Sequence, residues 1–346
     1  MPKNFWQQLK KKNKPIMCLA PMADVTDSAF RRIVVKYGGL AHCSLGKGGP
    51  DVIFTEFVSC DGLCSEGKKN LLLNLKYTEK ERPIVAQIFG AKPANFYQTA
   101  KIIKKLGFDG IDINMGCPHK HIERQSAGAA LIKNPELAQE IIKETKRGAG
   151  NMPVSVKTRL GYNKIETTSW IKTLLESRPD AISIHWRTRK EMSKVGAHWE
   201  EAKKVIKLRD KYSPQIVIIG NGDVETLEQA HKLADKYGVD GIMIGRAVIG
   251  NPWFFNTPSL PPSLKLRRTN PTSFLEQEGG LEEKLKVMLE HAKLFEKIFK
   301  NKKSFLLMRK HMIKYIKGFD NVKKLRIELM KTKNAKEVEK VVTKYC

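Results

Sequence analysis

A single cysteine, Cys117, stands at the end of an apolar run in the stretch "GIDINMGCPHKHIER". Pro118 follows it and restricts the cysteine backbone to extended conformations, so the thiol has a defined direction. An ordinary thiol has a pKa near ~8.5, so it could give a proton to a carbon that has just gained a hydride. The neighbouring Lys120, Arg124 and His119 could instead lower the pKa and make a nucleophilic thiolate. A buried free cysteine without a chemical role is the third interpretation, and the residues alone leave all three open.

Two glycine-containing stretches, "GNGDV" at 220–224 and "MIGRA" at 243–247, each follow an apolar run and could together hold a phosphate. Gly222 and Gly245 would let backbone amides approach an anion, and Arg246 could add a forked hydrogen bond. Asn-Gly-Asp is also a common turn, so neither stretch is specific alone. Their occurrence after the last two strands expected of a barrel favours a phosphate-bearing ligand.

Polar side chains also stand at the ends of other strand-like runs. Lys157 ends "VSVK", where a buried ammonium is costly unless it meets an anionic ligand or a neighbouring carboxylate. His185 ends "AISIH" and could reach the same cavity or be a satisfied core residue. Pro21 and Met22 could form a platform for a flat ring, and Gln87 could bind the edge of a heterocycle. Plain packing is the simpler explanation when these last three are taken alone.

Short β-rich apolar runs recur along the first part of the chain, with helical stretches between them. They resemble parallel strands that are buried on both faces. The expected strands are residues 15–20, 51–56, 83–89, 110–114, 153–158, 181–186, 215–220 and 241–245. Eight strand–helix units within about 250 residues predict an α/β fold, a (β/α)8 TIM barrel. The rival is a doubly wound open sheet, which would more often show a glycine-rich turn after its first strand than "LAPMADVTDS".

A proline-rich stretch without periodicity, residues 256–272, predicts a linker between two domains. Residues 1–255 before it form the expected barrel domain, which would bind the cofactor. Residues 273–346 after it predict a small helical bundle, because apolar residues recur there at helical spacing. The apolar stripes begin at Leu281, Phe305 and Val322.

Several helix boundaries are marked by the residues that usually cap helices. Asn134 followed by Pro135 is typical of an N-cap and a first helical residue. Gly238 is a natural carboxyl-terminal stop. Asn334 with Glu337 resembles a capping box that opens the last helix.

The chain is strongly basic. Its 346 residues carry 63 Lys and Arg against 36 Asp and Glu, a formal net charge of +27, and 41% of them are hydrophobic. From residue 258 onward there are 22 Lys and Arg against 10 Asp and Glu, so the excess extends over both predicted domains. It favours a polyanionic partner, nucleic acid first and an anionic membrane second, unless it reflects a lysine-rich composition without function. No apolar run approaches the ~20 residues of a membrane span, and the amino terminus lacks the core of a signal peptide, so a cytoplasmic protein is expected.

The six cysteines do not suggest a disulfide framework in a chain of this length, and they fit a reducing compartment. Cys60 and Cys64 in "CDGLC", with Cys43 beside His42, could in principle hold zinc. Because their spacing is not the usual two-residue kind, no metal is expected there.

Taken in order, the motifs of this chain resemble those of the tRNA-dihydrouridine synthase family. They are "LAPMADVTDSAFR", "AQIFG", "IDINMGCPHKHIERQSAGAAL", "VSVKTRLG", "IHWRTR", "NGDV" and "MIGRA". The tail "MRKHMIKYIKGF" resembles the helical domain of that family. The resemblance covers nearly the whole chain, its most specific element is "NMGCP", and it is closest to the bacterial B-type branch.

The resemblance implies an FMN enzyme that reduces the C5–C6 double bond of particular uridines in tRNA, with NADPH or NADH as the reductant. It makes Cys117 the catalytic proton donor to uracil C5, while hydride passes from flavin N5 to C6. It places Asn114 beside the uracil, with Arg187 and Arg189 near the rim of the active site. The target base must be turned out of its stack to reach this site. The resemblance assigns to the cofactor the residues Pro21, Met22, Ala23, Gln87, Lys157, His185, Asn221, Gly222, Asp223, Gly245 and Arg246.

The chain departs from the family pattern in three places. Residues 38–56 are longer than the usual stretch between the first helix and the second strand. Trp186 stands where a glycine is common, and His198 in "AHWE" stands where an aspartate is usual. None of these changes removes a residue assigned to the flavin or to proton transfer.

The expected partner is tRNA, and a monomer without an obligatory protein partner is expected. Two other functions stay open. A flavin oxidoreductase acting on free pyrimidines would not need the basic tail. A non-catalytic RNA-binding module could have kept the fold without the chemistry. The position of the modified uridine and the choice between NADH and NADPH are not predicted.

Overall fold

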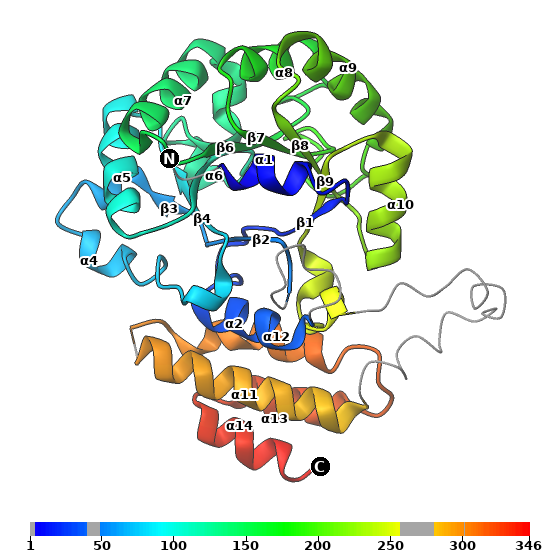
Figure 1. Ribbon diagram of the computed structural model, residues 1–346. Coiled ribbons are helices and arrows are strands. Elements are labelled where there is room, and N and C mark those ends of the chain that lie inside the picture. Colours follow the sequence, from blue (N-terminus) through cyan, green and yellow to red (C-terminus); the bar gives the residue numbers. More distant parts are fainter. Residues whose placement is uncertain (1–3, 40–48, 257–279, 301) are drawn as a thin grey trace. The chain divides into compact units, whose positions relative to one another are not determined.

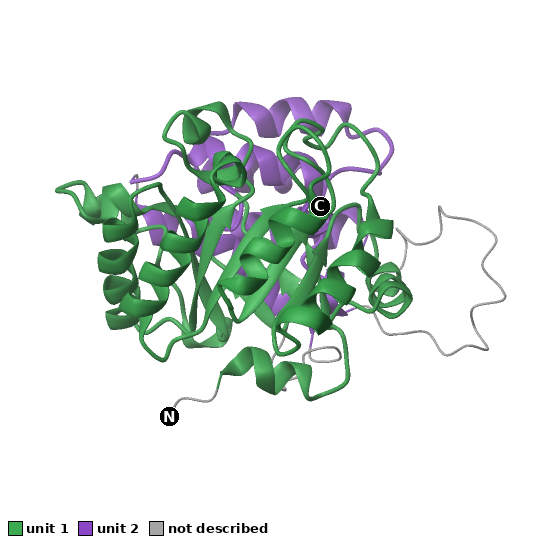
Figure 2. Ribbon diagram, turned by 90° about the horizontal axis from the view of Figure 1, so that it is seen from above, with its two compact units in different colours: residues 1–22, 50–244 green, residues 23–49, 245–346 purple. Residues whose placement is uncertain are grey.

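The computed structural model describes residues 4–39, 49–256, 280–300 and 302–346. It divides into two compact units (Figure 2). Unit 1 comprises residues 1–22 and 50–244, and unit 2 comprises residues 23–49 and 245–346. The expected linker, residues 256–272, lies outside the described residues from residue 257 onward.

Unit 1 is a TIM barrel, as the sequence predicts (Figure 1). Among its described residues, eight parallel strands close in the order β1, β2, β4, β5, β6, β7, β8 and β9, and β9 pairs back with β1. The short β3 pairs with the carboxyl end of β4. The strands are β1 (Ile16–Leu19), β2 (Val52–Phe54), β3 (Val58–Ser59), β4 (Ile84–Phe89), β5 (Gly110–Met115), β6 (Val154–Arg159), β7 (Ala181–His185), β8 (Val217–Asn221) and β9 (Gly241–Ile244).

Helices of unit 1 form an arc outside the strands from β4 to β9 (Figure 1), and the strands are buried. Nearly every strand residue is therefore buried, which explains the uninterrupted apolar runs. The N-cap at Asn134 and the left-handed stop at Gly238 are confirmed. The helices of unit 1 are α1 (Phe5–Lys10), α3 (Cys60–Leu63), α4 (Lys68–Leu71), α5 (Pro93–Lys105), α6 (Lys120–Glu123), α7 (Pro135–Ala149), α8 (Thr167–Glu176), α9 (Ala202–Tyr212) and α10 (Leu227–Tyr237).

Aspartates tie the amino ends of the barrel strands together. Each stands directly before one strand, and its carboxylate accepts a hydrogen bond from a backbone N–H at the start of the neighbouring strand. The pairs are Asp51 with Met17 (2.9 Å), Asp109 with Ile84 (2.8 Å), Asp180 with Val154 (2.8 Å) and Asp240 with Ile218 (2.8 Å). This end of the barrel therefore serves stability, and the opposite end is where TIM barrels carry their chemistry.

Unit 2 is a helical bundle that includes a helix from the early part of the chain. Its helices are α2 (Ser28–Tyr37), α11 (Leu281–Phe299), α12 (Met308–Tyr315), α13 (Lys323–Lys331) and α14 (Ala335–Val342). The predicted apolar stripes form its core, and Ala29 and Ile33 of α2 belong to the same core. At the start of α14 the Asn334 side chain accepts from the N–H of Glu337 at 2.9 Å, as the capping box predicts. The Glu337 carboxylate accepts from the N–H of Lys333, one residue before the N-cap, and not from the N–H of the N-cap itself.

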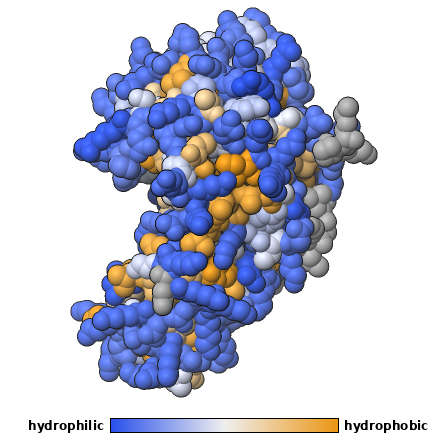
Figure 3. All heavy atoms as spheres, turned by 90° about the vertical axis from the view of Figure 1, so that its left-hand side faces the viewer, coloured by the Kyte–Doolittle hydropathy of each residue, from blue (hydrophilic) through white to orange (hydrophobic). Residues whose placement is uncertain are grey.

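Hydrophilic residues cover most of the face shown in Figure 3, in keeping with the high charge of the chain. Within the described ranges, no helix combines the length and apolar character that crossing a membrane requires.

Candidate active site

A chain of polar side chains crosses three neighbouring strands inside the barrel of unit 1. Gln87 on β4, Asp112 on β5 and Ser155 on β6 lie side by side in the strand register. The Asp112 carboxylate accepts from Gln87 Nε2 at 2.7 Å and from Ser155 Oγ at 2.6 Å. Gln87 Oε1 in turn accepts from Asn114 Nδ2 at 3.0 Å. Gln87 and Asp112 have no exposed surface, and Asn114 is 6% exposed, so these groups satisfy one another inside the protein.

Asp112 is the only ionisable group among these four hydrogen-bonded side chains. Its surroundings affect its pKa in opposite directions. Burial raises the pKa of the Asp112 carboxyl to about 6, against the hydrogen bonds from Gln87 and Ser155 and the charge of Lys157, which lower it. The deprotonated form, which can only accept hydrogen bonds, therefore predominates at neutral pH.

The peptide group that joins Gly116 to Cys117 is held at both of its ends. Its N–H donates to Asn114 Oδ1 at 2.9 Å. Its carbonyl oxygen accepts from Arg159 Nε at 2.8 Å. Asn114 Oδ1 also accepts from the N–H of Gly116 at 3.2 Å. The plane of the peptide before the cysteine is thus fixed by side chains from β5 and β6.

The environment of Cys117 keeps its thiol protonated. Burial raises the pKa of the Cys117 thiol above its ordinary value, and the backbone hydrogen bond at His119 and the charges of Arg159 and Lys157 offset this only in part. The side chain remains partly exposed. Of the three interpretations of this cysteine, the raised pKa argues against a thiolate.

The segment after Cys117 returns to pack on the cysteine, and it requires a glycine to do so. Gly128 has a φ of +62°, and a Cβ at this position would lie 2.8 Å from the carbonyl oxygen of Cys117 and 2.9 Å from Ile122 Cγ2. The N–H of Ala129 donates to the same carbonyl oxygen at 3.0 Å.

We expect the substitution Gly128→Ala to lower the free energy of unfolding by roughly 1–3 kcal/mol, because it adds both a strained backbone and a clash. Urea unfolding followed by circular dichroism measures this. Gly196→Ala is the control, since a Cβ at Gly196 has nothing within 4 Å and should change stability little. Equal effects of the two substitutions would contradict the expectation.

Lys157 supplies a cation at the carboxyl end of β6. Its ammonium donates to Asn221 Oδ1 at 3.5 Å, and Asn221 Nδ2 donates to the carbonyl of Met243 at 2.7 Å. Burial and the charge of Arg159, opposed by the charge of Asp112, lower the pKa of Lys157 to about 8. A half-buried ammonium with one long hydrogen bond has N–H donors left for an electron-rich ligand, so this donor set fits the edge of a flavin.

His185 and Asp223 are joined by Arg187. The guanidinium donates to His185 Nε2 at 2.9 Å and to the carbonyl of Val195 at 2.7 Å, and it forms an ion pair with the Asp223 carboxylate. Because a guanidinium only donates, His185 Nε2 accepts and the imidazole is neutral with its proton on Nδ1. Arg187 is 2% exposed, so its guanidinium contacts protein groups and not solvent, and its place near the rim of the active site stays a prediction. It holds other predicted site residues in place.

The turn after β8 is pressed against the segment around Ala197. Gly222 has a φ of +135°, and a Cβ there would lie 2.9 Å from Ala197 Cβ and 3.3 Å from His185 Cδ2. The carbonyl of Gly222 accepts from Trp199 Nε1 at 3.0 Å, and the Asp223 carboxylate accepts from the N–H of Ala197 at 2.9 Å. The shape of this turn therefore depends on glycine.

Arg189 pairs with Glu123, six residues beyond Cys117. Its Nε lies 2.8 Å from Glu123 Oε1, and its guanidinium carbon lies 5.3 Å from the centre of the Tyr162 ring. Burial alone would raise the pKa of Glu123, but the hydrogen bonds from Arg189 and Tyr162 outweigh it and lower the pKa. Arg189 is therefore the ion-pair partner of a carboxylate whose charge raises the pKa of the Cys117 thiol.

The side chains at the two single-residue departures from the family pattern, Trp186 and His198, both contact neighbouring side chains. Trp186 is fully buried and packs against Trp199, with ring centroids 5.6 Å apart. His198 lies 2.9 Å from Glu191 and 3.2 Å from Glu200. The hydrogen bond with Glu191 raises the pKa of His198 against the effect of burial.

The remaining predicted cofactor residues lie at the two points along the sequence where unit 1 ends and unit 2 begins. Pro21 and Met22 are half-buried and follow β1 in unit 1. Ala23, Gly245 and Arg246 belong to unit 2, where Gly245 precedes the short 3-10 turn Arg246–Val248.

Sequence reasoning missed Arg159 and Ser155. Arg159 stands two residues beyond Lys157 on β6, so the two side chains share a face of the strand. That spacing was the available signal for Arg159. Ser155 gave none, because a serine within a buried strand identifies no partner.

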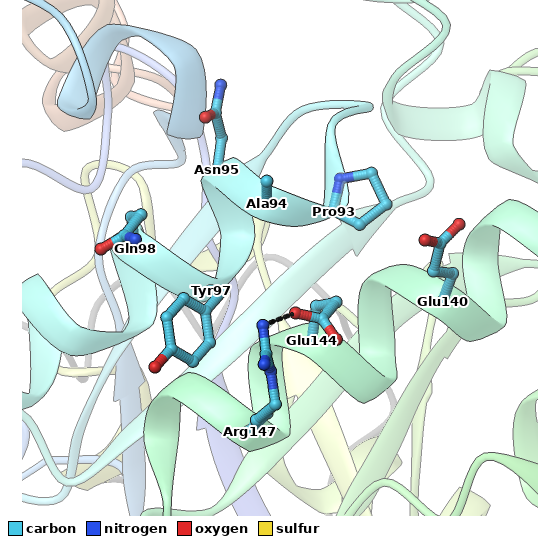
Figure 4. Close-up of a pocket in the computed structure, with 8 residues that line it drawn as sticks. All are labelled: Pro93, Ala94, Asn95, Tyr97, Gln98, Glu140, Glu144 and Arg147. Atoms are coloured by element: carbon cyan, nitrogen blue, oxygen red, sulfur yellow. Dashed lines mark hydrogen bonds and ion pairs between the residues drawn. The ribbon is translucent and has the colours of Figure 1, made fainter.

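The other features that could bear a function lie away from this network. A shallow depression of about 370 Å³ between α5 and α7 is lined by Tyr97, Glu140, Glu144 and Arg147, among others (Figure 4). It contains none of the predicted site residues. No group of three or more metal-ligating side chains occurs in the described part of the chain, and His42 and Cys43 lie outside it.

Three comparisons relate the chain to known proteins. The family model described as dihydrouridine synthase matches residues 18–345. A Staphylococcus aureus (strain MRSA252) protein named "Probable tRNA-dihydrouridine synthase" is 38% identical, over 100% of this chain and 96% of its own length. "Probable tRNA-dihydrouridine synthase 2" of Bacillus subtilis (strain 168) is 38% identical, over 98% of this chain and 95% of its own length. Among solved structures, an old yellow enzyme homologue from Zymomonas mobilis matches with a TM-score of 0.46 and 15% identity, over 70% of this chain and 89% of that chain.

Proposed function

The chain belongs to the dihydrouridine synthase family, and we propose that it reduces the C5–C6 double bond of uridines in tRNA, with FMN as its cofactor and NADPH or NADH as the reductant. As a member of this family it is an oxidoreductase. The observation that carries the finer proposal is the partly exposed Cys117 thiol, which its surroundings keep neutral at the carboxyl end of the barrel.

FMN, when bound, supplies hydride for the uracil ring. Lys157 would present its remaining N–H groups to the electron-rich edge of the cofactor, and Asn221 would hold the lysine in place. His185, with its proton on Nδ1, would act as a neutral donor. The other residues proposed to hold the cofactor are Pro21, Met22, Ala23, Gln87, Gly222, Asp223, Gly245 and Arg246.

Cys117 would give its proton to C5 of the uracil. A general acid must carry its proton at the working pH, and burial keeps the thiol in this form. Asn114, whose Oδ1 accepts from the N–H of Cys117, would help to position the base. Arg189 would keep the negative charge of Glu123 paired while the thiol reacts.

We propose that tRNA binds through the distributed positive charge of the chain, including residues 273–346. Affinity that depends on phosphate contacts should fall steeply with salt. A monomer in the cytoplasm is part of the same proposal.

The test uses the full-length protein and tRNA that lacks dihydrouridine. The purified protein should be yellow and release FMN on denaturation. With NADPH it should form dihydrouridine, measured by mass spectrometry of the digested tRNA.

Two results would contradict the proposal. Free uridine reduced as fast as tRNA would indicate a pyrimidine reductase. A colourless protein that binds tRNA without changing it would indicate a binding module.

A further inference from the structure

We propose that Asp112 is a positioning residue that fixes the direction of the Cys117 thiol through Gln87 and Asn114. The inference rests on the proposed role of Cys117 as the proton donor. Asp112 lies five residues before the cysteine, on the preceding strand, and acts only through other side chains.

The hydrogen bonds that link Asp112, Gln87 and Asn114 can run in only one direction. An ionised carboxylate accepts and cannot donate, so Gln87 must turn its amide nitrogen toward Asp112. Gln87 Oε1 then faces Asn114, which must donate from Nδ2. Asn114 Oδ1 is left to accept, and the N–H of Cys117 donates to it. A carboxylate at one end and backbone N–H groups at the other end thus orient both amides the same way.

This series of hydrogen bonds ends at the peptide group that joins Gly116 to Cys117. Arg159 binds the carbonyl of that peptide at 2.8 Å, and Asn114 binds its N–H at 2.9 Å. With both ends held, the peptide plane cannot rotate, so the direction in which Cys117 leaves the strand is set. Pro118 restricts the cysteine from the other side.

Because these side chains are buried, water cannot readily take over their hydrogen bonds. Gln87, Asp112 and Asn114 are all at least 94% buried. In such surroundings a hydrogen bond to a charged group is stronger than a neutral one, and a broken bond leaves polar groups without partners. Ser155 completes the chain by donating to the second carboxylate oxygen of Asp112.

The test compares two isosteric substitutions in the FMN-loaded protein. Asp112→Asn removes the charge and the acceptor-only character at the base of the chain. Asp180→Asn is the matched control, because Asp180 is also a hydrogen-bond acceptor beside a barrel strand, but it lies at the amino end of the barrel, where it accepts from the N–H of Val154. Hydrogen exchange at single amides, by fragmentation mass spectrometry, reports on the N–H of Cys117.

We expect Asp112→Asn to speed exchange at the amide of Cys117 about tenfold and to lower kcat with tRNA by a similar factor, from the difference between charged and neutral hydrogen bonds. KM for tRNA should change less than kcat, and rates are compared per bound FMN because Asp112 contacts Gln87, a proposed cofactor residue. Asp180→Asn should leave both the exchange of this amide and kcat unchanged.

Unchanged exchange at Cys117 in Asp112→Asn overturns the inference, whatever happens to activity. Faster exchange without a fall in kcat also overturns it, because positioning would then have no effect on the reaction. The exchange measurement needs no turnover. A protein that fails to reduce tRNA would therefore refute the proposed function, while the exchange measurement still tests whether Asp112 holds the peptide group before Cys117.

Discussion

Replacement of Cys117 by alanine should lower kcat for tRNA reduction by about 10²–10⁴-fold while leaving FMN bound. The thiol is the proposed proton donor, and its side chain is partly exposed at the end of β5. Alanine removes the proton without adding bulk, so the fold and the cofactor site should remain. The measurements are single-turnover formation of dihydrouridine and the absorbance spectrum of the bound flavin. Full activity of Cys117→Ala would remove this residue from the mechanism.

Cys64→Ala is the matched control, since Cys64 is an exposed cysteine on the same unit and should be replaceable without loss. The same experiment read against pH separates an acid from a nucleophile. An acid works in its protonated form, and the pKa of Cys117 is raised, so kcat should stay level from pH 7 to about 8.5 and fall only at higher pH. A thiolate nucleophile would show the opposite trend, with a rate that rises with pH.

The barrel could be predicted because its strands leave a local signal. Each strand is buried on both faces and reads as an apolar run, so all eight expected runs correspond to barrel strands. The helix ends at Asn134 and Gly238 were predictable for a similar reason, since a cap depends on residues only a few positions apart.

The connections within the site could not be predicted, because they depend on the register between strands. Asp112 meets Ser155 only through a pairing across 43 positions, and no local pattern specifies it. Arg187 illustrates the same limit. The sequence places this arginine just after a strand, but it does not reveal that the side chain is buried against Val195 and Asp223.

Unit 2 contains a second feature that the sequence does not reveal, a pair of buried histidines. His291 of α11 and His311 of α12 lie with their rings 4.6 Å apart, edge to face, and Phe30 of α2 packs on His311 at 5.0 Å. Tyr315 Oη lies 3.5 Å from His291 Nδ1, and neither ring nitrogen of His311 has a hydrogen-bond partner among the described residues. Both imidazoles are therefore neutral groups in an apolar environment.

We expect unit 2 to lose stability as the pH falls below about 6.5. Burial, together with the charge of Lys310, lowers the pKa of His311 to about 3. Burial and the neighbouring His311 hold the pKa of His291 well below its ordinary value. In the unfolded chain both histidines take up protons below about pH 6.5, and this protonation stabilises the unfolded state relative to the folded state. At pH 5 this costs about 2 kcal/mol for His311, and His291 adds to the loss.

The variant His311→Phe separates this effect from the general acid sensitivity of the protein. It removes one titrating group and two ring nitrogens without partners, so the variant should be at least as stable as the original at pH 7. Between pH 7 and pH 5 its loss of stability should be smaller by about 2 kcal/mol. Hydrogen exchange of peptides from α11 and α12, corrected for the intrinsic effect of pH, measures the stability of this unit separately from the barrel. If the two proteins lose the same stability over this range, His311 is already protonated in the folded state or is not buried as described.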